Sequence, residues 1–448
     1  MRRGVLIAVT ITSFLTPFTL SSVNVALPSI AFEFSANTVE MNWMATSFLI
    51  SSAMFLIPFG RLSDIYGRKR IFLLGTLLFS LFSLFASFTI NSNELILMRF
   101  LQGIGGAMIF STGIAILVSA FPERERGKVL GINTAAVYVG LSLGPFAGGI
   151  LTSNLGWRSI FILTFLLGVI ALTISMKKIG REKDGNIGEK FDLFGSVLYA
   201  FAVLLFIVGS SDRVYFLFIP LSAFLSLLFL LWESRQMHPV IDIRLFTSNM
   251  PFTLSNLSAL INYSATFALV YLMSIYLQIV LGLDPQIAGI VLVSQPAVMA
   301  LLSPLAGWTS DRIEPKFVAS GGMALNAISL ALLSTLTNTT HLGVILFYLV
   351  LMGLGFAFFS SPNTNAVMSS VDKKHYGIAS ATVSTMRVLG QTMSMAVVMF
   401  IFTLLLGNVL VRQIEIHSLM SAMKTSFQVF ALLSSAGVVV SFLRGNIR

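Results

Sequence analysis

The sequence contains no cysteine and only four histidines. The absence of cysteine excludes disulfides, thiolate metal sites and a cysteine nucleophile. The histidines are too scattered along the chain for a metal cluster: His238, His341, His375 and His417. The chain also lacks a Gly-Lys-Ser/Thr nucleotide-binding loop and a nucleophile paired with a base, which argues against an ATP-driven pump and an enzyme. We therefore expect no catalytic residues, no cofactor and no metal.

Charged residues are also scarce, at 10% of the chain, whereas 56% of the residues are hydrophobic. Such a composition excludes a soluble domain with a polar surface. A bilayer core of about 30 Å needs about 20 apolar residues per helix, and long apolar runs with short loops favour helices over a barrel. The sequence predicts an all-α polytopic membrane protein with fourteen spans, near residues 5–30, 42–60, 70–89, 94–121, 127–152, 157–178, 193–211, 214–233, 252–280, 286–308, 316–336, 341–362, 376–407 and 424–443.

The formal charge of +10 is explained by topology and does not require a nucleic-acid partner. Most Lys and Arg residues fall in alternate loops, which would be cytoplasmic if the amino terminus is cytoplasmic. The exceptions are Arg158, Arg213, Arg412 and Lys424 in the other loops and Arg99 and Arg387 within spans. We expect a multi-pass protein of the cytoplasmic (plasma) membrane with both termini cytoplasmic. Its partners would be the lipid bilayer, a small-molecule substrate and a coupling proton or sodium ion, and we expect a monomer.

Glycines recur in the same order at an offset of 250 residues, so that Gly103, Gly105, Gly127 and Gly140 correspond to Gly353, Gly355, Gly377 and Gly390. Gly60 and Asp64 similarly correspond to Gly307 and Asp311. This repeat predicts six-helix bundles over 1–180 and 251–448, separated by a linker and an inserted helical hairpin over 181–250. Duplicated halves place a substrate pathway between them near the middle of the membrane.

A polar loop, residues 60–70, joins the second and third predicted spans. Its acid, Asp64, lies between two glycines and could cap the helix that begins near Gly377. This predicts a latch that holds the cytoplasmic side shut; the alternative is that the loop only orients insertion through its positive charge. The predicted latch residues are Gly60, Asp64, Gly67, Arg68, Lys69, Gly377 and Asp311.

The fifth predicted span has glycines at 140, 144 and 148, on one face of a helix, with Gly149 beside them. They allow a neighbouring helix to approach closely, and Pro145 bends the span. The pattern predicts a pliable seal on the extracellular side, with ordinary close packing as the alternative.

Arg387 lies about 16 Å into its span and is costly in hydrocarbon. It predicts a wet cavity or gate; the alternative is a structural bond to helix carbonyls. Arg99 could line the same cavity or extend to the outer interface. The predicted cavity residues are Thr19, Asn24, Arg99, Gln102, Asn256, Asn262, Tyr263, Tyr271, Asn363, Asn365, Arg387 and Gln391.

These motifs resemble those of the major facilitator superfamily, and most closely its fourteen-helix drug:proton antiporter branch. The loop 60–70, residues 99–107 and residues 140–149 are similar to that superfamily's signatures, and residues 232–246 are similar to the fourteen-helix branch. The resemblance implies the major facilitator fold, multidrug efflux by antiport, and pairing of Arg68 and Lys69 with Glu123 or Glu125. Where that branch usually carries an aspartate before residues 24–28, this chain has Thr19.

Three functional hypotheses follow. The first is a secondary exporter of drug-like amphiphiles working by alternating access. The second is a dedicated exporter or facilitator of an anionic or zwitterionic metabolite, peptide or lipid, and the third is a receptor or scaffold without flux. No acidic residue lies deep in a predicted span, so proton coupling is in doubt, and Arg387 favours a neutral, zwitterionic or anionic cargo.

Overall fold

The computed structural model describes residues 2–180, 191–211, 213–236, 243–310, 312–372 and 376–446. These residues form helices joined by short turns, with one isolated antiparallel bridge between Asn37 and Leu410. The helices are α1 (Arg2–Phe34), α2 (Thr38–Tyr66), α3 (Arg68–Ala86), α4 (Ser92–Ala120), α5 (Glu123–Leu155), α6 (Arg158–Lys178), α7 (Leu193–Ser211), α8 (Phe218–Glu233), α9 (Ile243–Ser248), α10 (Met250–Thr266), α11 (Leu269–Ile275), α12 (Pro285–Ser310), α13 (Pro315–Leu333), α14 (Leu342–Ser369), α15 (Tyr376–Leu405) and α16 (Ile416–Leu443).

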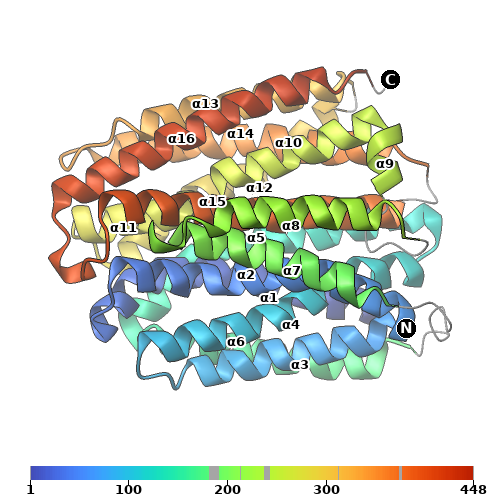
Figure 1. Ribbon diagram of the computed structural model, residues 1–448, viewed down its shortest axis with the longest axis horizontal. Helices are drawn as coiled ribbons and strands as arrows, with labels where there is room; N and C mark the ends of the chain where they lie inside the picture. The colour runs from blue at the N-terminus through green and yellow to red at the C-terminus, as the bar shows by residue number, and fades with distance from the viewer. Residues whose placement is uncertain are drawn as a thin grey trace.

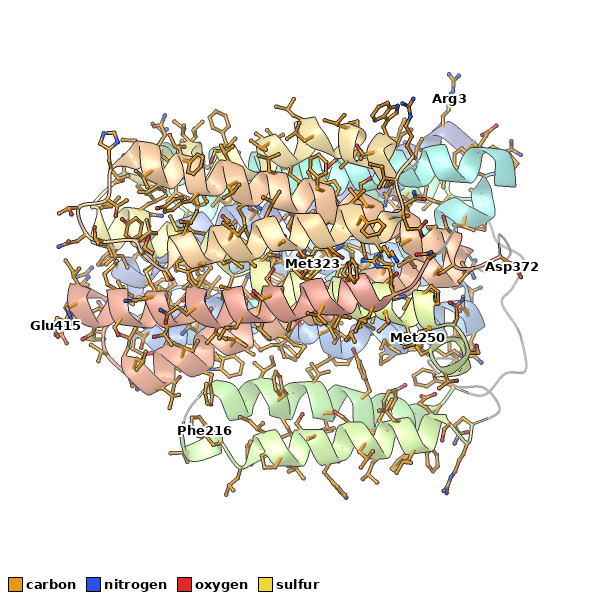
Figure 2. The ribbon with its side chains drawn as sticks, turned by 90° about the horizontal axis from the view of Figure 1, so that it is seen from above. Arg3, Phe216, Met250, Met323, Asp372 and Glu415 are labelled. Carbon is orange, nitrogen blue, oxygen red and sulfur yellow. The ribbon has the colours of Figure 1, made fainter. Side chains whose placement is uncertain are left out.

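The long helices run along the longest axis of the molecule, and both ends of the chain lie at the same end of this bundle (Figure 1). We call that end the terminal face and the other end the opposite face. Figure 2 shows Arg3, Met250 and Asp372 toward the terminal face and Phe216 and Glu415 toward the opposite face. A helix that starts at one face therefore ends at the other, as an up-and-down membrane bundle requires.

Twelve of the described helical stretches are long and apolar enough to cross a membrane, and two shorter apolar helices, Leu193–Gly209 and Phe218–Glu233, accompany them. Helices are present at all fourteen predicted positions. The apolar stretches of the inserted pair have at most 17 residues, whereas each of the twelve spans has at least 19. Both stretches fall below the roughly 20 residues that cross the hydrocarbon core.

The span predicted over 252–280 is not one continuous helix. It consists of α10, a break at Phe267 and Ala268, α11, and a π-helical turn over Tyr276–Val280. The Ala268 amide donates to the Ser394 hydroxyl of α15 at 3.0 Å. An amide freed by a break inside a membrane protein needs such a partner, because lipid offers none.

The helices form two groups. Helices α1–α6 pack mainly on one another, as do α10–α16, and the contacts between the groups run chiefly through α5 with α12, α2 with α15 and α1 with α11. Recurring glycines occupy corresponding contacts in the two groups. A Cβ on Gly103 would lie 2.3 Å from a backbone oxygen of α2, and one on Gly353 would lie 2.4 Å from a backbone oxygen of α12. Gly140 approaches α1 and Gly390 approaches α10 in the same way.

The α7–α8 hairpin lies along one edge of the bundle, with Phe216 at its turn (Figure 2). Helix α7 contacts both α2 and α15, so it covers the seam between the two groups on that side. The Tyr199 hydroxyl donates to the Ala53 carbonyl at 2.9 Å, and the Phe216 ring stacks on Phe400 at 4.9 Å between centroids. The hairpin is therefore attached to the bundle at both of its ends.

Candidate functional site

A cavity lies between the two groups of helices, walled by α1, α2, α4 and α5 on one side and by α10, α14 and α15 on the other. The space in it that is accessible to water is about 90 Å³. Its lining includes Ser13 near the start of α1, Asn133 in the first third of α5 and Thr364 near the end of α14. All three positions belong to the half of the bundle nearer the terminal face. The cavity is therefore displaced toward that face.

Arg387 is the charged residue among the described residues that line the cavity. Its guanidinium lies over the ring of Tyr263, 5.4 Å from the centroid, and its Nε has no hydrogen-bond partner among the residues that the structure describes. Gln391 lies one turn further along α15 and also lines the cavity. Three of the twelve predicted cavity residues, Tyr263, Arg387 and Gln391, are thus brought together.

Most residues of the cavity wall were not predicted from the sequence, and Asn133 and Tyr138 are among them. The hydroxyls of Tyr138 in α5 and Ser360 in α14 are hydrogen-bonded to each other. Asn133 is 6% exposed, and its Oδ1 has no partner. A signal was present, because residues 133, 137, 138 and 141 form a helical stripe. The sequence interpretation rested instead on the glycines further along the same helix.

Four predicted cavity residues of the first group do not line this cavity: Thr19, Asn24, Arg99 and Gln102. All four are at most 3% exposed. The Thr19 hydroxyl bonds to Thr164 of α6 at 3.0 Å, so that face of α1 is turned away from the cavity. Arg99 donates to Gln102 Oε1 at 2.7 Å and lies 4.8 Å from the centroid of the Phe48 ring, so it does not reach the outer interface.

Five predicted residues of the second group are also outside the wall. Four of them bond to other helices, and Asn256 bonds within its own helix, α10. The partners are the Phe252 carbonyl for Asn256, Asn326 for Asn262, Asn42 for Tyr271, the Ser255 carbonyl for Asn363 and Ser310 for Asn365. Side chains that satisfy each other between helices are the ordinary use of polar residues in membrane bundles.

The two groups of helices are joined at the opposite face. The backbone of the α1–α2 turn pairs with the α15–α16 loop, where the Thr38 amide donates to the Val409 carbonyl at 2.9 Å. Deeper in, Gln278 Nε2 donates to the Val25 carbonyl at 2.8 Å, and Tyr271 bonds to Asn42. Because these bonds lie beyond the cavity, they separate it from the opposite face.

The glycines of α5 pack at backbone distance on two neighbours. Cβ atoms on Gly140, Gly144 and Gly148 would lie 2.5–2.7 Å from atoms of α1. A Cβ on Gly149 would lie 2.5 Å from the Pro285 carbonyl of α12, and one on Gly289 would lie 2.3 Å from the Pro145 carbonyl. Helix α5 therefore touches the second group on the side of the opposite face.

The predicted latch loop forms the turn between α2 and α3. Asp64 bonds to Arg68 at 2.9 Å, and Lys69 donates to the Ile179 carbonyl at the end of α6. Gly60 lies in the last turns of α2, and Gly67 has a φ of +99°, a conformation that favours glycine. Asp311 and the surroundings of Gly377, at the start of α15, lie outside the described residues, so the predicted cap on that helix stays a prediction.

The family model described as Major Facilitator Superfamily matches residues 9–395 and again 255–446. The riboflavin transporter RibZ of Clostridioides difficile is 31% identical over 387 residues, covering 86% of this chain and 84% of that protein. The multidrug resistance protein Stp of Mycobacterium tuberculosis is 29% identical, covering 84% and 71%. The tetracenomycin C resistance and export protein of Streptomyces glaucescens is 25% identical, covering 90% and 76%.

Among solved structures, the POT family transporter PepTSo matches with a TM-score of 0.72 at 14% identity, covering 99% of this chain and 98% of that one. A bacterial homologue of the human lysosomal transporter Spinster, in an inward-facing and occupied conformation, matches with a TM-score of 0.71 at 16% identity, covering 99% and 96%. At these identities the likeness concerns the fold.

Proposed function

Because the chain belongs to the Major Facilitator Superfamily and is thus a secondary transporter and not an enzyme, we propose that it exports amphiphilic small molecules by alternating access. The observation that carries the proposal is a single cavity walled by both groups of helices and separated from the opposite face by the bonds of α2 and α11. Rocking of one group against the other would close the cavity and break those bonds.

The proposal includes the domain organisation and orientation expected from the sequence. The six-helix bundles would be residues 1–180 and 251–448, with the linker and hairpin in 181–250, and the terminal face would be cytoplasmic in the plasma membrane. The matching glycine contacts of the two groups support the duplication. With this orientation the structure is inward-facing, and the close contact of α5 with α12 is its extracellular seal. The relatives named as exporters of drugs and antibiotics support efflux.

We further propose that the cargo is neutral, zwitterionic or anionic. Arg387 is 5.4 Å from an aromatic centroid and carries a free Nε, so an anionic or carbonyl oxygen would complete its bonding. The described wall offers no carboxylate to a cation, whose burial without a counter-ion is costly. A second candidate function is transport of one dedicated metabolite, which the 31% identity to a riboflavin transporter favours.

The test is flux in proteoliposomes that contain the full chain, under imposed pH or sodium gradients. The probes are carboxyfluorescein as the anion, riboflavin as the neutral amphiphile and ethidium as the cation. We expect Arg387→Ala to lower carboxyfluorescein flux at least about tenfold, since a bond to a charged group contributes about 1.5–3 kcal/mol. We expect Arg387→Lys to retain part of that flux.

Arg235→Ala is the matched control, because Arg235 is exposed at the end of α8 and far from the cavity wall. Its flux should equal that of the unchanged protein. Robust export of ethidium together with unchanged carboxyfluorescein flux in Arg387→Ala would reject the proposed cargo. Flux that depends on pH alone would show that a titrating group takes part.

A further inference from the structure

One face of α5 lines the cavity with four residues: Asn133, Val137, Tyr138 and Leu141. Their spacing of four, five and eight residues along a helix places them on one stripe. The two polar members differ in their bonding. The Tyr138 hydroxyl is occupied by Ser360, whereas Asn133 Oδ1 has no partner among the described residues.

Four buried asparagine oxygens have no hydrogen-bond partner among the described residues: those of Asn133, Asn256, Asn326 and Asn363. Of these, Asn133 is the one in the cavity wall, and it is 6% exposed. Buried amide oxygens in folded proteins almost always accept a hydrogen bond, and leaving one unpaired is unfavourable. Since Asn133 lies in the cavity wall, a bound molecule that carries an N–H or O–H group can supply the missing donor. The α5 side of the cavity therefore presents an acceptor.

The α15 side presents the complementary chemistry. Arg387 is a pure donor, and its buried Nε has no partner. Its guanidinium is held over the Tyr263 ring, so its position is set by the aromatic ring and not by a carboxylate. A bound molecule that carries a carbonyl or anionic oxygen would pair with it.

Aromatic rings line the same cavity as these two polar groups. Phe48 of α2, Phe110 of α4 and the two tyrosines Tyr138 and Tyr263 all line the cavity. Flat aromatic faces complement a flat ligand, and they add apolar contact area without competing for hydrogen bonds.

We infer that this cavity recognises planar heteroaromatic molecules with an N–H group beside a carbonyl, as in an imide or lactam. The ligand N–H donates to Asn133 Oδ1, and a ligand carbonyl or anionic oxygen accepts from Arg387. The inference rests on the proposed transport function and narrows its cargo to one chemical class, with Asn133 as the residue that selects for the donor.

The experiment compares two probes that differ only in that donor, riboflavin and 3-methylriboflavin. Binding to the purified full chain is measured by quenching of flavin fluorescence. We expect riboflavin to bind about tenfold more tightly, the effect of one buried hydrogen bond. Asn133→Leu should abolish this preference, whereas Asn133→Asp, which keeps an acceptor, should retain it. Arg387→Ala should weaken the binding of both probes.

The control is Asn154→Leu on the same helix, because Asn154 is exposed near the opposite face and bonds to the Ile150 carbonyl. It should leave both affinities unchanged. Equal binding of the two flavins to the unchanged protein, or a preference that survives Asn133→Leu, overturns the inference. If neither flavin binds while carboxyfluorescein flux persists, the inference fails and the transport proposal stands; if no amphiphile is transported, the transport proposal itself fails.

Discussion

The Tyr271 hydroxyl of α11 donates a hydrogen bond to the amide oxygen of Asn42 in α2. Both residues are at most 1% exposed, and they belong to different groups of helices. The bond therefore joins the two groups of helices on the side of the opposite face. The sequence predicted Tyr271 to line the cavity, and the structure places it between the cavity and the opposite face.

We expect Tyr271→Phe to make the cavity accessible from the opposite face. Losing a hydrogen bond costs about 0.5–1.5 kcal/mol, which shifts the equilibrium about two- to tenfold. The chain has no cysteine, so a single Gln391→Cys reporter can be labelled with an impermeant maleimide added from one side. Labelling from the opposite face should rise by that factor.

Tyr276→Phe is the matched control for this prediction. Its hydroxyl donates to the Thr337 carbonyl at 2.7 Å, a bond within the second group of helices. Its loss should leave the labelling unchanged. Equal labelling in all three proteins would show that the Tyr271 bond does not contribute to closure.

We expect Gly149→Ala to disfavour the closed opposite face, because its Cβ would lie 2.5 Å from the Pro285 carbonyl. Forcing such a contact apart costs about 1–3 kcal/mol. The same Gln391→Cys labelling should therefore rise from the opposite side, with a lower transport rate.

Two further glycines control this result. Gly321→Ala meets no atom within 4 Å and should be silent, whereas Gly103→Ala clashes only within the first group. Gly103→Ala should lower Tm without changing the side from which the cavity is labelled. A labelling change of equal size in Gly103→Ala would mean that general destabilisation, and not the α5–α12 contact, explains the effect.

We expect Asp64→Asn to slow transport at least about tenfold with little change in Tm. Its ion pair with Arg68 is 34–43% exposed, and such surface pairs contribute about 0–1 kcal/mol. If Asp64 caps α15 when the cytoplasmic side closes, Asp64→Asn should slow transport more than removal of Arg68, its partner in the present ion pair. Measuring Arg68→Ala in parallel decides this, because equal effects of both variants would contradict a latch role for the acid.

We expect Arg444→Gln to lower Tm, because the buried guanidinium donates to the Ser441 carbonyl at 2.8 Å and to Ser255 at 3.4 Å. Burial lowers the pKa of Arg444 to about 10. The pKa of Arg444 is lower in the folded protein than in the unfolded chain. Its contribution to the free energy of unfolding therefore changes with pH only as pH rises through and above about 10. The Tm difference between the two proteins should therefore be constant from pH 5 to 8, measured by thermal melts; a difference that changes within that window would contradict this assignment.

The sequence predicted the helices well because their signal is long and redundant, as in α14, where apolar residues run through more than a whole bilayer thickness. It also identified Arg387, because a mid-span arginine needs a polar surrounding wherever it faces. For the remaining polar residues, expected burial did not indicate which neighbouring helix each side chain would face. Thr19 turns to α6 and Asn262 to α13, and only the crossing of the helices determines that choice.

Asn133 was not predicted from the sequence for a different reason. A single asparagine near the end of a span does not by itself indicate a site, and what distinguishes Asn133 is an oxygen with no partner among the described residues. An unpaired hydrogen-bond acceptor can be recognised only from the three-dimensional structure. The break in the span over 252–280 was missed as well, because residues 266–269 contain neither proline nor glycine.

The bond between the Ala268 amide and Ser394 gives α15 a second connection besides its place in the cavity wall. Ser394 follows Arg387 by two helical turns, about 10 Å along the axis and on the same side of the helix. If a ligand that binds Arg387 shifts α15, we expect the break at Ala268 to shift with it, and with it α11, which carries the bond to Asn42. Helix α15 would then couple cargo binding in the cavity to opening at the opposite face. Ser394→Ala should remove this coupling, so that cargo binding no longer alters Gln391→Cys labelling from the opposite face.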